Sequence, residues 1–266
     1  DDQESDLQQL LDQEVEQPFN LEQGPLVRAQ IIKFTPDSYR ILFTAHHIIC
    51  DGWSMSVVVR DLGKLYTAAK TGSVSDLPPA FKFSDYALLE EEEKRNNTNR
   101  EAAAYWNKLY ADEAPVTDLP TDRLRPPLRS YEGRRIDLQL DPELVTGLKQ
   151  VGARYSATFL TVLLAGFEAF LSRITGQEDL VVGIPAAGQS ATGRTTLVGH
   201  CVNILPLRGQ IDPRSKFSEL LESVRSAMLD AYENQRYTFG SLIKTLPQTH
   251  RDPGRIPLMP ILFNID

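Results

Sequence analysis

The sequence predicts an α/β or α+β fold, a two-layer sandwich of helices packed on strands. Three observations support this prediction. Helical and extended patterns alternate along both halves of the chain, and 41% of the 266 residues are hydrophobic, which is enough to bury a core. A proline-rich stretch between the halves predicts a linker at 114–133, with an N-terminal lobe at 1–113 and a C-terminal lobe at 134–266.

The first lobe begins with a predicted helix at Glu4–Glu16, whose leucines recur at helical spacing and which Pro18 ends. Two apolar segments, Leu26–Phe34 and Tyr39–Thr44, flank four turn-forming residues and therefore predict a β-hairpin. An amphipathic helix follows, with Ser54 as its expected N-cap.

A long helix is expected at Phe83–Leu109, and its run of charged residues is typical of a solvated face. In the second lobe the pattern predicts three helices and four strands. The helices are Glu143–Tyr155, Ser156–Arg173 and Phe217–Asn234, and the strands are Arg134–Leu140, Leu180–Ile184, His200–Leu207 and Met259–Ile265, with a flexible loop at Pro185–Gly199.

Charge and composition exclude several classes of protein. The 28 Lys and Arg residues against 36 Asp and Glu residues give a net charge of −8, which disfavours a general nucleic-acid or anionic-membrane surface. The longest apolar runs fall short of the ~20 residues that a membrane helix needs. Two cysteines, Cys50 and Cys201, are expected to be free thiols in a cytoplasmic protein.

The segment richest in chemistry runs from His46 to Ser54, with the sequence HHIICDGWS. Adjacent histidines on an extended backbone point to opposite faces, so only one of them faces a given cleft. An aspartate followed by glycine suits a turn in which the carboxylate holds local structure and the backbone approaches a neighbour closely. The start of the following helix favours neutral imidazole, the form that a general base needs. The segment is a candidate acyl-transfer site.

Simpler interpretations of the same residues compete with this one. His46 and His47 also fit a hydrogen-bonded pair at a strand end, and His200 and His250 fit ordinary structural histidines. A metal site built from His46, His47 and Asp51 is disfavoured, because adjacent strand residues diverge. Cys50 has no base beside it and is expected to pack as a small apolar residue rather than act as a nucleophile.

The His46–Gly52 segment resembles the HHxxxDG signature of the condensation domains of nonribosomal peptide synthetases, including the Trp-Ser that often follows it. Further segments resemble other family motifs in the same order along essentially the whole chain. They are Phe19–Leu26, Phe83–Ala87, Leu197–Asn203 and Tyr232–Gln235 with Phe239 and Leu242.

This resemblance implies a chloramphenicol-acetyltransferase-like fold, in which two lobes form a V-shaped pseudo-dimer with a central tunnel. It implies peptide-bond formation between a donor acyl or peptidyl thioester and an acceptor aminoacyl thioester. Both thioesters would be carried on the phosphopantetheine arms of peptidyl carrier proteins, and adenylation and carrier domains would lie next to this domain in the synthetase. The resemblance implies no tightly bound cofactor and no binding to nucleic acid or to a membrane.

The resemblance also assigns roles to individual residues. His47 maps to the catalytic histidine, as a general base or as a group that positions the amine and stabilises the transition state. The supporting positions are His46, Asp51, Gly52, Trp53 and Ser54, and the tunnel-lining candidates are Gln189, Ser190 and Asn203.

The sequence also departs from the family pattern. Nothing matches the S-x-A-Q-x-R and R-H-E-x-L-R segments that precede HHxxxDG, so the first lobe is expected to be incomplete at its start. The chain stops at Met259–Asp266, before the family segments that complete the second lobe, so that lobe is expected to be incomplete at its end. The isolated chain is therefore expected to be weakly active or inactive. Gln189 stands where many members carry arginine, so an ionic partner for Asp51 is either missing or supplied by Arg194. The alternative function is a carrier-protein docking module, or an inactive fragment of such a domain, without chemistry.

Overall fold

The computed structural model describes residues 2–112, 115–124, 126, 128, 133–246 and 256–265. The backbone divides into two compact units. Unit 1 comprises Asp1–Leu89 and Thr192–Cys201, and unit 2 comprises Glu90–Ala191 and Val202–Asp266. Residues 90–112 therefore group with unit 2, and a ten-residue segment from the second half of the chain groups with unit 1; the predicted lobe boundaries themselves stay a prediction.

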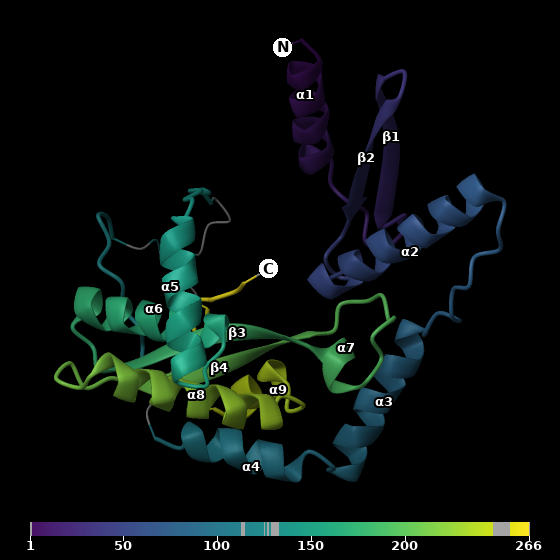
Figure 1. The fold of residues 1–266 in the computed structure, drawn as a ribbon. Coiled ribbons are helices and arrows are strands. Elements are labelled where there is room, and N and C mark those ends of the chain that lie inside the picture. The colour runs from purple at the N-terminus through teal and green to yellow at the C-terminus, as the bar shows by residue number, and fades with distance from the viewer. Residues whose placement is uncertain are drawn as a thin grey trace. The chain divides into compact units, whose positions relative to one another are not determined.

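Unit 1 contains helix α1 (Asp2–Glu16) and an antiparallel hairpin of β1 (Val27–Thr35) and β2 (Ser38–Ala45) (Figure 1). The hairpin predicted from the two apolar segments is confirmed, with Val27 paired to Ala45 and Ile31 to Ile41. Arg28 of β1 forms an ion pair with the buried Glu14 of α1, which fastens the helix to the hairpin.

Helix α2 (Gly52–Thr71) follows the hairpin after a short turn. Its N-cap is Asp51, whose side chain accepts a hydrogen bond from the Ser54 amide, so the prediction of Ser54 as the N-cap was wrong. A serine near the start of a helix resembles a cap in sequence, but here the helix begins at Gly52 and the Asp51 carboxylate bonds the free amide of Ser54. Gly72, with φ of 68°, ends the helix in the left-handed conformation.

The single helix predicted at Phe83–Leu109 is two helices, α3 (Phe83–Asn96) and α4 (Arg100–Leu109). The break falls at Asn97, which has a positive φ of 51°. Asparagine tolerates this conformation better than most residues, because its short polar side chain bonds locally. One carboxylate of the charged run, Glu93, pairs with Arg236 within unit 2.

Unit 2 is built on an antiparallel pair of long strands, β3 (Asp179–Ala187) and β4 (Val202–Gln210). The pairing runs in continuous register from Asp179–Gln210 to Ala187–Val202. Helices α6 and α8 pack against each other, α6 contacts β3, and α8 contacts β4 (Figure 1). The helices of this unit are α5 (Pro142–Arg154), α6 (Phe159–Thr175), α7 (Gly188–Ala191), α8 (Phe217–Glu233) and α9 (Phe239–Thr245).

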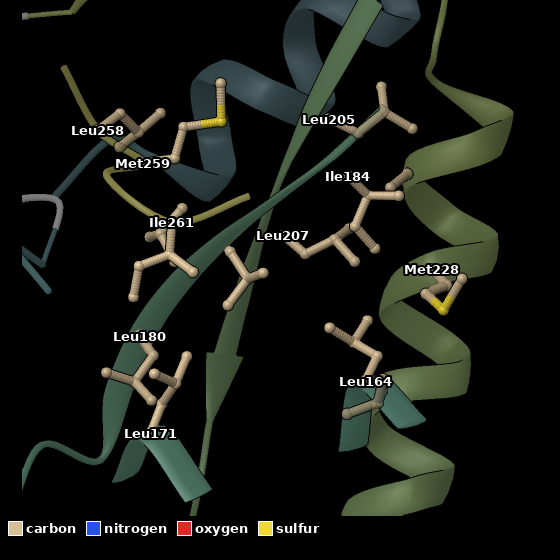
Figure 2. Close-up of a cluster of buried hydrophobic side chains, with 14 of the residues drawn as sticks. Leu164, Leu171, Leu180, Ile184, Leu205, Leu207, Met228, Leu258, Met259 and Ile261 are labelled. Atoms are coloured by element: carbon tan, nitrogen blue, oxygen red, sulfur yellow. The ribbon is translucent and has the colours of Figure 1, made fainter. Parts of the chain in front are cut away.

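The core of unit 2 lies between these strands and helices. Figure 2 shows side chains from both strands meeting those of the surrounding helices and of the C-terminal segment. Leu164 and Leu180 are fully buried, and a buried leucine of this kind contributes roughly 1.5–3 kcal/mol. Hydrophobic burial thus contributes to the stability of unit 2.

Other predictions for the second half need correction. Arg134–Leu140 forms no strand, and Ile136 and Leu138 are exposed, so its alternating pattern finds no partner strand among the described residues. Met259–Ile265 contributes only an isolated parallel bridge between Leu262 and Gly183. The predicted loop at Pro185–Gly199 begins as strand and continues as α7, and α9 was not predicted.

The helix predicted to begin at Ser156 is α6, which begins at Phe159 with Thr158 as its N-cap. Among the described helices, none is by itself both long and apolar enough to cross a membrane. Helices α5 and α6 meet that criterion only as a pair, and they are bent by 103° at their junction.

Candidate active site

The candidate site of unit 1 occupies the turn between β2 and α2. The His46 amide donates to the Leu26 carbonyl at 2.9 Å, which extends the hairpin ladder by one bond beyond Ala45. The Ile49 amide then donates to the His46 carbonyl at 3.0 Å, and the chain turns toward α2. The hairpin end and the helix start thus fix both ends of the His46–Asp51 segment.

The two adjacent histidines have different surroundings. His46 is half-buried, its ring meets Phe19 edge-on at 5.8 Å, and its Nδ1 accepts a hydrogen bond from the Ile48 amide at 3.1 Å. His47 is exposed, and its Nδ1 lies 3.1 Å from Nδ1 of His200. One histidine is therefore committed to local structure, while the other presents its imidazole at the surface of unit 1.

Asp51 ties the turn to a distant part of the chain. Its side chain is buried, and Oδ1 accepts hydrogen bonds from the Ser54 amide at 2.8 Å and the Ser54 hydroxyl at 2.7 Å. Oδ2 accepts from the Cys201 amide at 3.0 Å. Asp51 thus caps α2 and also anchors the backbone next to His200.

Ser54 and Trp53 make further links to the same segment. Ser54 Oγ accepts a hydrogen bond from the Gly199 amide at 2.9 Å and lies 2.9 Å from the Gly199 carbonyl oxygen. Its single proton serves either that carbonyl or Asp51 at a given moment. The Trp53 indole donates to the Thr195 carbonyl at 3.0 Å. Residues of the first turn of α2 therefore hold the 192–201 segment at several points.

Gly199 is required here because of close packing. A Cβ atom at this position would lie 2.2 Å from Cδ2 of Phe83, far inside van der Waals contact. Phe83 also stacks near Tyr86, which forms a small buried cluster with Leu197 and Cys201. The 192–201 segment is therefore held by apolar packing as well as by its hydrogen bonds to the first turn of α2.

Gly52 differs from Gly199 in this respect. No atom lies within 4 Å of the position that a Cβ of Gly52 would occupy. The close approach expected at this glycine is therefore not made by another part of the described chain, and open space remains at the first residue of α2.

Cys50 is buried and free. Burial, together with the negative charge of Asp51, raises the pKa of its thiol above the ordinary value. A raised pKa disfavours the thiolate, which is the reactive form. The environment of Cys50 is that of a packing residue.

The three tunnel-lining candidates all lie in unit 2. Gln189 is fully buried and Ser190 is exposed, both on α7. Asn203 uses its amide to donate to the carbonyls of Gln235 and Tyr237 and to accept from the Phe239 amide, which braces the connection between α8 and α9. A tunnel-lining role for these residues stays a prediction.

Arg194, the expected alternative partner of Asp51, places its guanidinium over the Phe81 ring, 5.6 Å from the centroid. The bonds to Asp51 described above come instead from Ser54 and Cys201. Within the described ranges, no three His, Cys, Asp or Glu side chains gather as a metal-ligand set.

The contact between His47 and His200 was not predicted from the sequence. The two residues are 153 positions apart, and no local pattern links them. The segment Leu197–Asn203 resembled a family motif and was predicted to contribute a strand. In the structure, residues 197–201 of this segment belong to unit 1, where His200 contacts His47.

The chain is similar to known proteins in both sequence and fold. The family model for the condensation domain matches residues 1–266. One of the plipastatin synthase proteins of Bacillus subtilis (strain 168) is 38% identical over 246 residues, which are 92% of this chain and 9% of that protein. Gramicidin S synthase 2 of Brevibacillus brevis is 34% identical over 250 residues, 94% of this chain and 6% of that protein.

Solved structures show the same fold. The first condensation domain of the CDA synthetase matches with a TM-score of 0.79 at 24% identity, over 98% of this chain and 57% of that one. The X-domain from teicoplanin biosynthesis matches with a TM-score of 0.82 at 23% identity, over 97% of this chain and 59% of that one. The chain thus spans a small fraction of the curated synthases and somewhat more than half of the solved domains. The chain belongs to the condensation domain family of nonribosomal peptide synthetases.

Proposed function

We propose that the chain contributes the catalytic histidine of a domain that forms peptide bonds between two carrier-bound thioesters. The observation that carries this proposal is the position of His47. Its imidazole is exposed on the turn between β2 and α2, while His46 and Asp51 are engaged in local structure. The match to the condensation domain family, and the similarity to a plipastatin synthase protein and to gramicidin S synthase 2, support it.

The proposed reaction joins an acceptor aminoacyl thioester to a donor acyl or peptidyl thioester. The acceptor amine nitrogen attacks the donor carbonyl carbon, a C–N bond forms, and a tetrahedral intermediate results. The C–S bond then breaks and the donor phosphopantetheine leaves as a thiolate. As a general base, His47 takes a proton from the amine on Nε2 and returns it to the leaving sulfur, so that protons and charges balance.

A second role for His47 is to position the amine and stabilise the tetrahedral intermediate by a hydrogen bond, without proton transfer. Both roles place the same side chain at the reacting centre, and proximity alone contributes rate factors comparable with those of a base. The variant His47→Gln separates them, since glutamine keeps a hydrogen-bonding group near Nε2 but does not accept a proton at neutral pH. A rate for His47→Gln close to that of wild type supports positioning, and a rate as low as that of His47→Ala supports the general base.

The partners proposed are the donor and acceptor peptidyl carrier proteins, with adenylation and carrier domains in the same assembly. The aligned region is only 9% of the plipastatin synthase protein, which leaves room in that relative for further domains. Phosphopantetheine enters as part of the substrates, and no tightly bound cofactor is proposed. We place the protein in the cytoplasm, in keeping with two cysteines that are not joined in a disulfide.

The alternative is a module that docks carrier proteins without chemistry. The test mixes loaded donor and acceptor carriers with the full-length protein that contains this chain and follows the acceptor-bound product by mass spectrometry. If the domain is catalytic, the wild-type protein forms acceptor-bound product and the His47→Ala variant forms much less. Both proteins bind the carriers equally well. Carrier binding without product from wild type would instead establish the docking module.

A further inference from the structure

The two histidines that meet in unit 1 come from distant parts of the sequence. Nδ1 of His47 and Nδ1 of His200 are 3.1 Å apart. Their ring centroids are 5.0 Å apart, and the ring planes are inclined by 71°. This is hydrogen-bond distance between two nitrogen atoms, and at this distance either ring is able to be the donor.

A hydrogen bond between two imidazole nitrogens needs a proton on one nitrogen and a lone pair on the other. If Nδ1 of His47 donates, Nε2 of the same ring keeps its lone pair and is able to accept a proton. If Nδ1 of His200 donates instead, neutral His47 carries its proton on Nε2 and has no basic nitrogen left for a substrate. The identity of the donor therefore decides whether His47 is competent as a base.

We propose that His200 is a positioning residue for His47. Nδ1 of His200 accepts a hydrogen bond from the protonated Nδ1 of His47, so that Nε2 of His47 keeps its lone pair and faces the acceptor amine. This inference rests on the proposed function, in which Nε2 is the reacting nitrogen. Once Nε2 has taken the substrate proton, Nδ1 still donates to His200, and the hydrogen bond stabilises the imidazolium. The role is comparable in kind to that of the third residue of a hydrolase triad, but with a neutral acceptor.

The backbone on both sides of His200 is held by the turn that carries His47. The amide of the preceding residue, Gly199, donates a hydrogen bond to Ser54 Oγ, and the carbonyl oxygen of Gly199 lies within hydrogen-bond distance of the same hydroxyl. The following residue, Cys201, donates its amide to Asp51. Both anchors are buried, so they define the position of the His200 backbone within unit 1.

Packing restricts the same segment further. Phe83 lies against Gly199 where a Cβ would otherwise project, and the Trp53 indole holds the Thr195 carbonyl. A contact held by several independent anchors keeps its geometry through a reaction, which is the property that a positioning residue needs. The supporting function of Asp51, Trp53 and Ser54 thus extends to His200 and, through it, to His47.

The first test reads the tautomer of His47 directly. The chain has four histidines, so selective ¹⁵N-histidine labelling gives few ring signals, and single histidine variants assign them. The proposal predicts a protonated Nδ1 and an unprotonated Nε2 on His47 in the wild-type chain. A neutral His47 ring that carries its proton on Nε2 would overturn it.

Two variants at position 200 form a matched pair. His200→Phe keeps an aromatic ring of similar size but has no acceptor, whereas His200→Asn keeps an acceptor oxygen near the place of Nδ1. We expect His200→Phe to move the His47 proton to Nε2 in part of the population and to lower kcat about tenfold in the full-length protein, with KM for the loaded carriers unchanged. His200→Asn should restore the tautomer and most of kcat.

Internal controls keep the outcome clear. The His46 ring accepts from the Ile48 amide, independently of His200, so its ¹⁵N signals should be the same in all variants. Unchanged His47 signals and kcat in a folded His200→Phe protein would overturn the proposal. If that variant did not fold, the wild-type tautomer and His200→Asn would still decide. Loss of activity in His47→Ala together with unaffected His200 variants would refute only the positioning role, whereas full activity in His47→Ala would refute the proposed function.

Discussion

The Oδ2 atom of Asp51 accepts a hydrogen bond from the backbone amide of Cys201, 3.0 Å away and 150 positions further along the chain. The other oxygen of the same carboxylate caps helix α2 through Ser54. One buried side chain thus joins the histidine turn to the segment that carries His200. Its charge is balanced by hydrogen bonds to both oxygens, a typical arrangement for a buried carboxylate.

Replacing Asp51 by asparagine should destabilise unit 1 more than it impairs chemistry. An amide has one acceptor oxygen, so its NH₂ group must face either the Ser54 donors or the Cys201 amide, and one buried donor loses its partner. We expect the free energy of unfolding to fall by about 2–3 kcal/mol, measured by urea denaturation. Asp76→Asn, at an exposed carboxylate, is the control and should melt like wild type. An Asp51→Asn protein that melts like wild type but forms no product would contradict this structural role.

The packing of Gly199 against Phe83 predicts a coupled pair. A methyl group at position 199 would overlap the phenylalanine ring and force it to move, at a cost of about 1–3 kcal/mol in stability. Phe83→Ala removes the obstacle, so Gly199→Ala should cost little in that background. A double-mutant cycle measures this coupling by thermal or urea unfolding. Strictly additive effects would show that the ring and the glycine are independent.

Gly63→Ala is the control for this cycle. Gly63 lies within α2, and a Cβ there would meet no atom within 4 Å. Alanine is the better helix former, so this substitution should raise stability by up to about 1 kcal/mol.

An alanine at position 52 should affect activity rather than stability, in contrast to an alanine at position 199. Because space is open around the position of its Cβ, Gly52→Ala should fold with unchanged or slightly higher stability. In the proposed reaction the substrate approaches this residue, so the methyl group should hinder the substrate and lower kcat/KM about tenfold or more. The melting temperature and kcat/KM of one variant therefore separate the two effects. Wild-type turnover by Gly52→Ala would show that no substrate approaches this residue.

Glu168 in unit 2 predicts a dependence of stability on pH. Its side chain is buried, Oε2 has no hydrogen-bond partner among the described residues, and burial raises the pKa of the carboxyl from 4.5 to about 7. Between these two values the unfolded chain releases the proton while the native protein keeps it. Stability should therefore fall as the pH rises from about 4.5 to 7, and level off above that range.

The variant Glu168→Gln removes this titration. Relative to wild type, we expect it to gain about 2–3 kcal/mol in unfolding free energy between pH 5 and pH 8. The difference between the two pH values is the informative quantity, because any cost of burying the amide is the same at both. Glu222→Gln on the exposed face of α8 serves as the control and should show no such change. A pH-independent difference for Glu168→Gln would mean that the carboxyl is charged in the native protein.

Much of this fold was predictable because its signals are local. The hairpin follows from two apolar runs around a turn, and helices such as α8 follow from their amphipathic period. Helix ends were less predictable, since Asp51 and Ser54 are both good caps and only the three-dimensional bonds select Asp51. The strand expected at Arg134–Leu140 failed for a related reason, because alternation of apolar residues predicts a strand only where a partner strand exists.

The site was predictable to the extent that it lies in one segment. His46 and His47 could be distinguished by their alternation along an extended backbone. The contribution of His200, Gly199 and Cys201 was not predictable, because long-range contacts between a turn and a loop leave no periodic pattern in either segment. Motif order along the chain indicated that Leu197–Asn203 mattered, but not that part of it contacts His47.

His47 is proposed to provide the reacting imidazole, and a single-turnover rate measures its contribution. Loaded donor and acceptor carriers are mixed at saturating concentration with the full-length protein and with its His47→Ala variant, and the formation of acceptor-bound product is timed. We expect the rate of product formation by the variant to be lower by a factor of about 10²–10⁴, with carrier affinity and melting temperature unchanged. Equal rates for the two proteins would contradict it.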